Sequence, residues 1–183
     1  GEIFITGVFR GTSPFGATTL TSVSGSQDIF IAKLDNNGNF IWAKSMGGTL
    51  SEWANAIETD NSGNVVFTGY FGGTADFDPS PSVFNIVSVA ATTDIFLAKL
   101  DANGNFLWAK QLGNSAEADA GYSIAVDAAG NVYTTGSFRS PADFDPGPGT
   151  YNLNSSGIFD EVFVSKLDAS GNFVWAKGFG GLD

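Results

Sequence analysis

The residues with the clearest chemical potential lie in the segment ADFDPGPGT, 142–150. Asp143 and Asp145 are one residue apart there, and Asp76 and Asp78 repeat the arrangement in TADFDPSPS, 74–82. Loop carboxylates with this spacing are candidate ligands for calcium, which takes about six to eight oxygen atoms. The alternative is an acidic turn stiffened by its two prolines, with the phenylalanine between the aspartates (Phe77 or Phe144) packed inward. Both interpretations are open from the sequence.

Two observations limit the calcium interpretation. The first copy of the segment reads SPFGATT, 13–19, and has no aspartate, so a metal essential to every copy is excluded. The next acidic residue after Asp145 is Asp160, which lies beyond the twelfth position of an EF-hand loop. Calcium therefore remains a candidate cofactor only at Asp76, Asp78, Asp143 and Asp145, and no other cofactor is expected.

Composition removes several classes of chemistry. The chain has no histidine and no cysteine, which excludes the usual zinc sites, Ser-His-Asp triads and disulfides. The net charge is −11 with only 8 Lys and Arg residues, which argues against nucleic acid and anionic membrane surfaces as partners. No apolar run approaches the roughly 20 residues that cross a bilayer. No set of residues has a catalytic pattern, so we predict no catalytic residues and no enzyme.

The elements that must position these loops repeat along the chain. LDNNGNFIWAK, 34–44, returns as LDANGNFLWAK, 100–110, and as LDASGNFVWAK, 167–177, at a period of about 67 residues. DNSGNVVFTG, 60–69, returns in step as DAAGNVYTTG, 127–136. Each full period contains four runs rich in Val, Ile, Phe, Tyr and Thr, separated by Asp, Asn and Gly. The sequence therefore predicts four strands per repeat.

The hairpin formed by the third and fourth runs is apolar on both faces. Strict alternation places one set of side chains on one face (Phe30, Ala32, Leu34, Phe40, Trp42) and a second set on the other (Ile29, Ile31, Lys33, Ile41, Ala43). A sheet of this kind needs cover on both sides, which radially stacked blades provide. We therefore expect an all-β fold of four-stranded antiparallel propeller blades. A β-solenoid is the rival, but its repeats are shorter.

The linked motifs I-A-x-D, G-N-V-Y-x-T-G, D-x-F-x-A-K-L-D and G-N-F-x-W-A-K-x-x-G-G resemble the bacterial SBBP family of β-propeller repeats, and more loosely NHL-type blades. The resemblance implies a secreted or cell-surface bacterial propeller, with no single activity tied to it. The expected blades are residues 1–47 (first strand missing), 48–113 and 114–183. These make about two and three-quarter blades, fewer than a closed ring of roughly 4–8. Either the chain is part of a longer one, which we favour, or several copies assemble.

Strand order separates the loops onto two faces. The short Asp-x-x-Gly-Asn turns connect strands one to two and three to four, and we expect them to be structural, like the repeated lysines and tryptophans. The long, variable loops lie on the opposite face, which we call the variable face. A ligand site is expected there, with these candidate residues: Glu52, Trp53, Glu117, Asp119 and Tyr122.

These observations predict a non-catalytic extracellular module that acts in scaffolding, adhesion or assembly at a bacterial surface or in a secreted protein. Its expected partners are other blades of the same or a neighbouring chain, and a protein or glycan. Neither nucleic acid binding nor membrane insertion is expected. The alternative is a carbohydrate-binding or carbohydrate-active propeller that uses the variable face.

Overall fold

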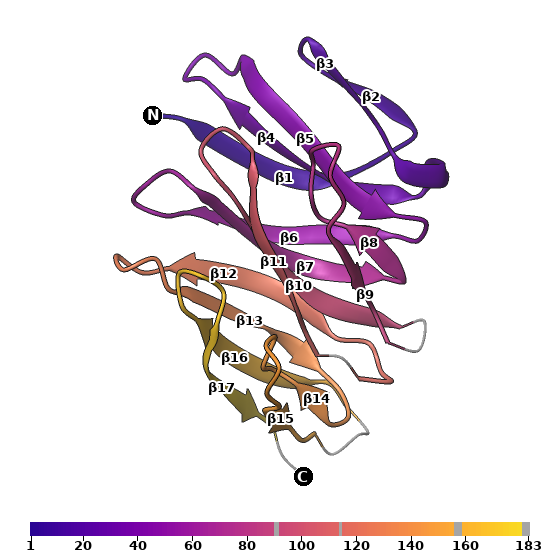
Figure 1. Ribbon diagram of the computed structural model, residues 1–183, viewed down its shortest axis with the longest axis vertical. Coiled ribbons are helices and arrows are strands. Elements are labelled where there is room, and N and C mark those ends of the chain that lie inside the picture. Colours follow the sequence, from indigo (N-terminus) through magenta and orange to yellow (C-terminus); the bar gives the residue numbers. More distant parts are fainter. Residues whose placement is uncertain (90–91, 114, 156–158, 181–183) are drawn as a thin grey trace.

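A computed structural model describes residues 1–89, 92–113, 115–155 and 159–180 of the chain. Three antiparallel sheets follow one another along the sequence and are stacked along the long axis of the molecule (Figure 1). Blade 1 contains β1 (Ile3–Arg10), β4 (Gln27–Leu34) and β5 (Phe40–Gly48). Blade 2 contains β6 (Glu52–Thr59), β7 (Val65–Gly72), β10 (Thr93–Leu100) and β11 (Phe106–Leu112). Blade 3 contains β12 (Ala120–Val126), β13 (Val132–Phe138), β16 (Glu161–Leu167) and β17 (Phe173–Phe179).

In the two complete blades the four strands pair in sequence order, which is the meander expected of a propeller blade. The all-β propeller prediction is thus confirmed for the described residues. A 3-10 turn, η1 (Val23–Gly25), precedes β4. No helix in the described part of the chain has the length and apolar character needed to cross a membrane.

The core lies between the stacked sheets. Between blades 1 and 2, Ile29 and Ile31 of β4 belong to the same buried cluster as Phe67 of β7. Between blades 2 and 3 the equivalent residues of β10, Ile95 and Leu97, belong to a second cluster. Each such side chain contributes about 1.5–3 kcal/mol by leaving water. Both faces of the blade 2 sheet are therefore buried, as the apolar pattern predicted.

The predicted division of the hairpin faces was wrong for Trp42 and Ala43. A β-bulge between Lys33 and Leu34 shifts the register, so that Lys33 lies opposite Trp42 and Ala32 opposite Ala43. A bulge adds one residue to a strand, and every side chain beyond it then changes face. Trp42 consequently packs on the blade 2 side of β5, whereas Ala43 joins Ala32 on the other side. The same bulge occurs in blades 2 and 3.

The long connection between the second and third strands folds into a short hairpin in each blade. These hairpins are β2 (Thr12–Phe15) with β3 (Thr18–Thr21), β8 (Thr74–Asp76) with β9 (Asn85–Val87), and β14 (Ala142–Asp143) with β15 (Asn152–Leu153). One phenylalanine of each hairpin packs on two or more phenylalanines of its own blade. Phe144, for example, lies 5.6 Å from Phe138 and 4.8 Å from Phe163, measured between ring centroids. Phe77 and Phe144 are fully buried, which confirms their predicted inward packing.

The hairpins of blades 2 and 3 also join each of these blades to the blade before it. Asp143 and Gly113, at the end of blade 2, exchange two backbone hydrogen bonds of 2.6 and 2.8 Å. In the same way β8 pairs with the last residues of β5, with Asp76 opposite Gly47 and Ala75 opposite Gly48. We call this pairing the clasp. A Cβ on Gly48 would overlap the Thr74 carbonyl, so this close approach of two backbones requires glycine.

The five Asp-x-x-Gly-Asn turns are structural, as predicted. In the turn at Asp60, one carboxylate oxygen accepts the amides of Ser62 and Asn64, and the other accepts the Asn64 side chain. Asp35, Asp101, Asp127 and Asp168 repeat these contacts in their own turns. These aspartates close the turns on the face opposite the hairpins.

Candidate functional site

A pocket of about 390 Å³ opens on the variable face between blades 2 and 3. Three of the predicted ligand-binding residues line it, namely Glu117, Asp119 and Tyr122. Glu117 and Asp119 come from the connection between the blades, and Tyr122 comes from the innermost strand, β12. The blade junction therefore brings these three residues together, and we call the space the interblade pocket.

Aromatic and hydroxyl groups form much of the wall of the interblade pocket. Tyr122 is 55% exposed, and its phenol is 3.3 Å from the Ser137 hydroxyl. Tyr70 of β7 lines the same wall, and Trp53 is stacked on Tyr70 with 6.3 Å between ring centroids. Trp53 thus supports the pocket through Tyr70. Tyr70 and Ser137 were not predicted, although both stand at the ends of strands that lead into the variable loops.

Charges of both signs surround the interblade pocket. Arg139 and Asp160 form an ion pair of 2.7 Å at its edge, and Glu117 is exposed beside them. The Asp119 carboxyl is turned into the protein, where it accepts the Arg139 amide and is 3.0 Å from the Ser115 hydroxyl. Burial raises the pKa of Asp119 to about 7, and the charges of Asp94 and Asp160 add to this effect. Asp119 therefore holds the connecting loop, and only Glu117 offers a free carboxylate.

Glu52 lies apart from the interblade pocket. It is the counterpart of Asp119 at the junction of blades 1 and 2, and it is fully buried. Sequence reasoning missed its neighbour, Asp28, and the equivalent Asp94 in blade 2, both of which are almost fully buried. The signal was available, because an aspartate recurs directly before the apolar third strand in DIFIAKLD and DIFLAKLD.

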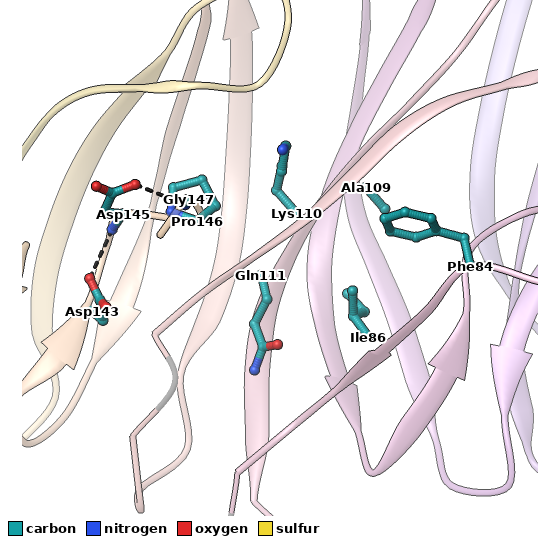
Figure 2. Close-up of a pocket in the computed structure, with 9 residues that line it drawn as sticks. All are labelled: Phe84, Ile86, Ala109, Lys110, Gln111, Asp143, Asp145, Pro146 and Gly147. Atoms are coloured by element: carbon teal, nitrogen blue, oxygen red, sulfur yellow. Dashed lines mark hydrogen bonds between the residues drawn. The ribbon is translucent and has the colours of Figure 1, made fainter. Parts of the chain in front are cut away.

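The acidic hairpin of blade 3 borders a separate groove, which Figure 2 shows. Asp143, Asp145, Pro146 and Gly147 lie on one side, and Phe84 and Ile86 of the preceding hairpin lie on the other (Figure 2). Lys110 and Gln111 of β11 lie between the two sides. The groove measures about 340 Å³, and a smaller one of about 110 Å³ adjoins Asp76 and Asp78.

The aspartates of the hairpins hold turns. Asp143 Oδ1 accepts the amides of Asp145 and Tyr151, and Asp145 Oδ1 accepts the amide of Gly147. Asp76 and Asp78 make the matching bonds in blade 2. Within the described ranges, no three acidic, histidine or cysteine side chains are placed to hold a metal ion. The geometry favours the proline-braced turn, and calcium binding by these four residues stays a prediction.

The repeated lysines of the third strands and two of the repeated tryptophans contact other groups of the blades. Lys99 pairs with the turn aspartate Asp60 at 2.9 Å, and both side chains are nearly buried. Lys33 and Lys166 make related pairs with Glu2 and Asp127. Trp42 and Trp108 each donate the indole N–H, at 3.3 Å, to a turn carbonyl of the next blade. These repeated polar groups are therefore already engaged within and between blades.

Comparison with known proteins agrees with this architecture. Residues 107–137 match the SBBP family, described as a beta-propeller repeat. The matched segment runs from the fourth strand of blade 2 into the second strand of blade 3 and so crosses a blade junction.

Two larger proteins are also similar to the chain. It is 31% identical over 139 residues to an uncharacterized WD repeat-containing protein, L264, of Acanthamoeba polyphaga mimivirus, over 72% of this chain and 9% of that protein. It is 27% identical over 150 residues to the regulatory protein FlaEY of Caulobacter vibrioides, over 82% of this chain and 15% of that protein. The chain thus spans only a small part of either relative. The repeated four-stranded sheets and the match over residues 107–137 together show β-propeller repeats, with the SBBP similarity located in that segment.

Proposed function

We propose that the chain is a non-catalytic scaffold, a run of propeller blades that joins further blades and serves adhesion or assembly. The observation that carries this proposal is the use of the repeated residues. The repeated third-strand lysines are in ion pairs, two of them with turn aspartates, and Trp42 and Trp108 bind the next blade. A repeat whose recurring polar groups make contacts within and between its own blades is suited to a structural role.

The exposed face of blade 3 supports a further blade as partner. Val162 and Phe179 are 50% and 57% exposed, whereas the equivalent residues of blade 2, Ile95 and Leu112, are fully buried against blade 3. Gly180 follows β17 as Gly113 follows β11, and Gly113 takes part in the clasp. A blade that covers this face can belong to the same chain or to a neighbouring one.

An extended chain tests the proposal. Residues 114–180 are repeated once at the C-terminal end, and the melting temperature is compared with that of the original chain. We expect an increase, because Val162 and Phe179 become buried. The matched control carries proline in the added copy at the position equivalent to Asp143, which removes the amide that the clasp needs. An added blade that leaves the melting temperature unchanged, or that acts equally well with this proline, contradicts the proposal.

The second candidate function is carbohydrate binding in the interblade pocket. The specific observation is the combination of Tyr70 and Tyr122 with hydroxyl, arginine and carboxylate groups in one open pocket. A glycan array tests it, with Tyr122→Ala and Trp53→Ala expected to abolish any hit. Phe179→Ala removes an exposed aromatic ring elsewhere and is the control. A hit that survives Tyr122→Ala places the glycan outside the pocket, and hydrolysis of the glycan contradicts a non-catalytic role.

We also propose an extracellular or cell-surface location in a bacterium. The resemblance to SBBP repeats and the acidic surface, with a net charge of −11, support this location. Proteolysis of intact cells that produce the parent protein tests it. Cleavage at the blades without lysis is expected, and protection until lysis contradicts the proposal.

A further inference from the structure

Two buried acidic side chains from different blades meet at the junction of blades 1 and 2. Asp28 lies at the beginning of β4, and Glu52 is the first residue of β6. A Cβ built on Gly47 would be 2.6 Å from Asp28 Cγ and 2.8 Å from Glu52 Oε2. The two carboxyl groups therefore flank one small region beside the Gly47 backbone. Asp28 is 2% exposed and Glu52 is 0% exposed.

No positive charge compensates this pair. Both oxygens of Glu52 lack a hydrogen-bond partner, although the Gly48 amide is near enough to lower the carboxyl pKa somewhat. Burial, with the Asp28 charge adding to it, nevertheless raises the pKa of Glu52 to about 8. Among the described residues, the four ion pairs involve neither Asp28 nor Glu52. The guanidinium of Arg10 is directed to the Gly25 carbonyl, at 2.6 Å.

The surroundings of the pair are rich in oxygen, and the donors present reach Asp28 and not Glu52. The Val23 amide donates to Asp28 Oδ2 at 2.8 Å, whereas neither oxygen of Glu52 has a partner. The Ser26 hydroxyl oxygen lies 2.6 Å from the Val23 carbonyl, 2.7 Å from Asp28 Oδ1 and 2.8 Å from the Gly48 carbonyl. A hydroxyl group has one proton and can donate to only one of these acceptors. Carboxylate, carbonyl and hydroxyl oxygens are the ligands that calcium prefers.

We propose that Asp28 and Glu52 bind a calcium ion that links blade 1 to blade 2. Neighbouring carbonyl or hydroxyl oxygens and water complete the coordination, which calcium tolerates in irregular geometries and magnesium does not. The rival is a proton shared by the two carboxyl groups. A shared proton would remove one negative charge without a metal, so this rival predicts no response to added calcium.

The junction of blades 2 and 3 contains an equivalent pair of buried acids, Asp94 and Asp119, but more of their oxygens accept hydrogen bonds. Asp119 has partners for both oxygens, and Asp94 Oδ2 accepts the Val89 amide and the Gln111 side chain. Only Asp94 Oδ1 is without a partner. The residue equivalent to Gln111 in blade 1 is Ser45, whose shorter side chain makes no such bond to Asp28. Protein donors thus neutralise much of the second pair, which makes Asp119 a matched control.

Thermal unfolding of the full chain at pH 7.5 tests the proposal. The protein is treated with EDTA, dialysed, and measured with no divalent cation, with 5 mM calcium or with 5 mM magnesium. Extracellular calcium modules bind with dissociation constants of about 0.1–1 mM. Such a site predicts that calcium raises the melting temperature by roughly 3–6 °C, and magnesium by less.

Variants assign the effect to the proposed ligands. Glu52→Gln keeps the shape and removes the buried charge, so it should fold without calcium and lose the calcium-dependent increase. Asp119→Asn should keep that increase. The proposal is overturned if calcium leaves the wild-type melting temperature unchanged, which would mean that the pair holds only a proton. It is equally overturned if Glu52→Gln responds to calcium as the wild type does.

Discussion

Asp119→Asn should make the chain more stable at pH 8 and change its stability little at pH 4. In the folded chain burial raises the pKa of the Asp119 carboxyl to about 7, from an ordinary value of 3.8. Between these two values the folded state holds a proton that the unfolded state has released. The contribution of Asp119 to stability is therefore fully present below about pH 4 and is lost as the pH rises toward 7.

The magnitude follows from the two pKa values. The difference between 3.8 and about 7 corresponds to about 4 kcal/mol at most, since one pKa unit is about 1.4 kcal/mol. An asparagine preserves the local contacts, because its oxygen can accept the Arg139 amide and its amide group can donate to Ser115. We therefore expect the variant to exceed the wild type by up to about 4 kcal/mol at pH 8.

Urea unfolding at pH 4, 5, 6, 7 and 8 in the presence of EDTA measures this difference. EDTA removes any calcium, and Glu52 titrates equally in both proteins, so its effect cancels in the comparison. The free energy of unfolding of the variant minus that of the wild type should grow with pH and level off above about pH 7. A difference that is constant across the series refutes the burial argument for Asp119.

Three further predictions concern the architecture. Gly48→Ala should lower the free energy of unfolding by about 1–3 kcal/mol, because the added Cβ overlaps the Thr74 carbonyl in the clasp. Gly72→Ala is the control, since its added Cβ would lie 3.6 Å from the nearest atom, Leu50 Cβ. Chemical denaturation should show that the control costs less than half as much. Phe144→Ala should lower the free energy of unfolding by about 3–5 kcal/mol, because the ring is fully buried. Asp143→Asn keeps an acceptor oxygen for the Tyr151 amide and should lower it by less than about 1 kcal/mol. If calorimetry gives the reverse order, the carboxylates and not the ring hold the hairpin. Burial alone would raise the pKa of Asp60, but its bonds to Asn64 and Lys99 outweigh burial and lower the pKa. The stability that Asp60 contributes above about pH 4 should therefore be lost as the pH falls further. Asp60→Asn should reduce this decrease in a profile of melting temperature against pH.

The fold was predictable from the sequence because residues that recur at the same position of every repeat are the ones that a blade needs for its structure. Asp60 and Lys99 recur in every full copy, and their repetition indicated structure before their ion pair was known. The inward packing of Phe144 was likewise predictable. A large apolar side chain between two aspartates in a proline-braced turn is expected to point toward the core, because the aspartates favour solvent. Trp42 was assigned to the wrong face because a β-bulge leaves no mark in the hydrophobic alternation.

The candidate site was predictable only in part. Glu117, Asp119 and Tyr122 were assigned to one face from strand order alone, and the structure brings them to one pocket. Tyr70 was missed because its place in that wall depends on how two blades stack. Asp28 was missed because a single aspartate before a strand resembles an ordinary turn residue. Its meeting with Glu52 depends on the angle between blades, which no local pattern encodes.

Amide hydrogen exchange at Gly113 and Gly180 tests the central claim most directly, namely that blades join through a repeated clasp and that blade 3 can receive another. The Gly113 amide donates to the Asp143 carbonyl across the junction at 2.8 Å and should exchange slowly. The Gly180 amide should exchange quickly in the original chain and slowly once a further copy of the blade follows. Equal rates at the two glycines in the original chain, or a fast Gly180 amide in the extended one, would contradict the account.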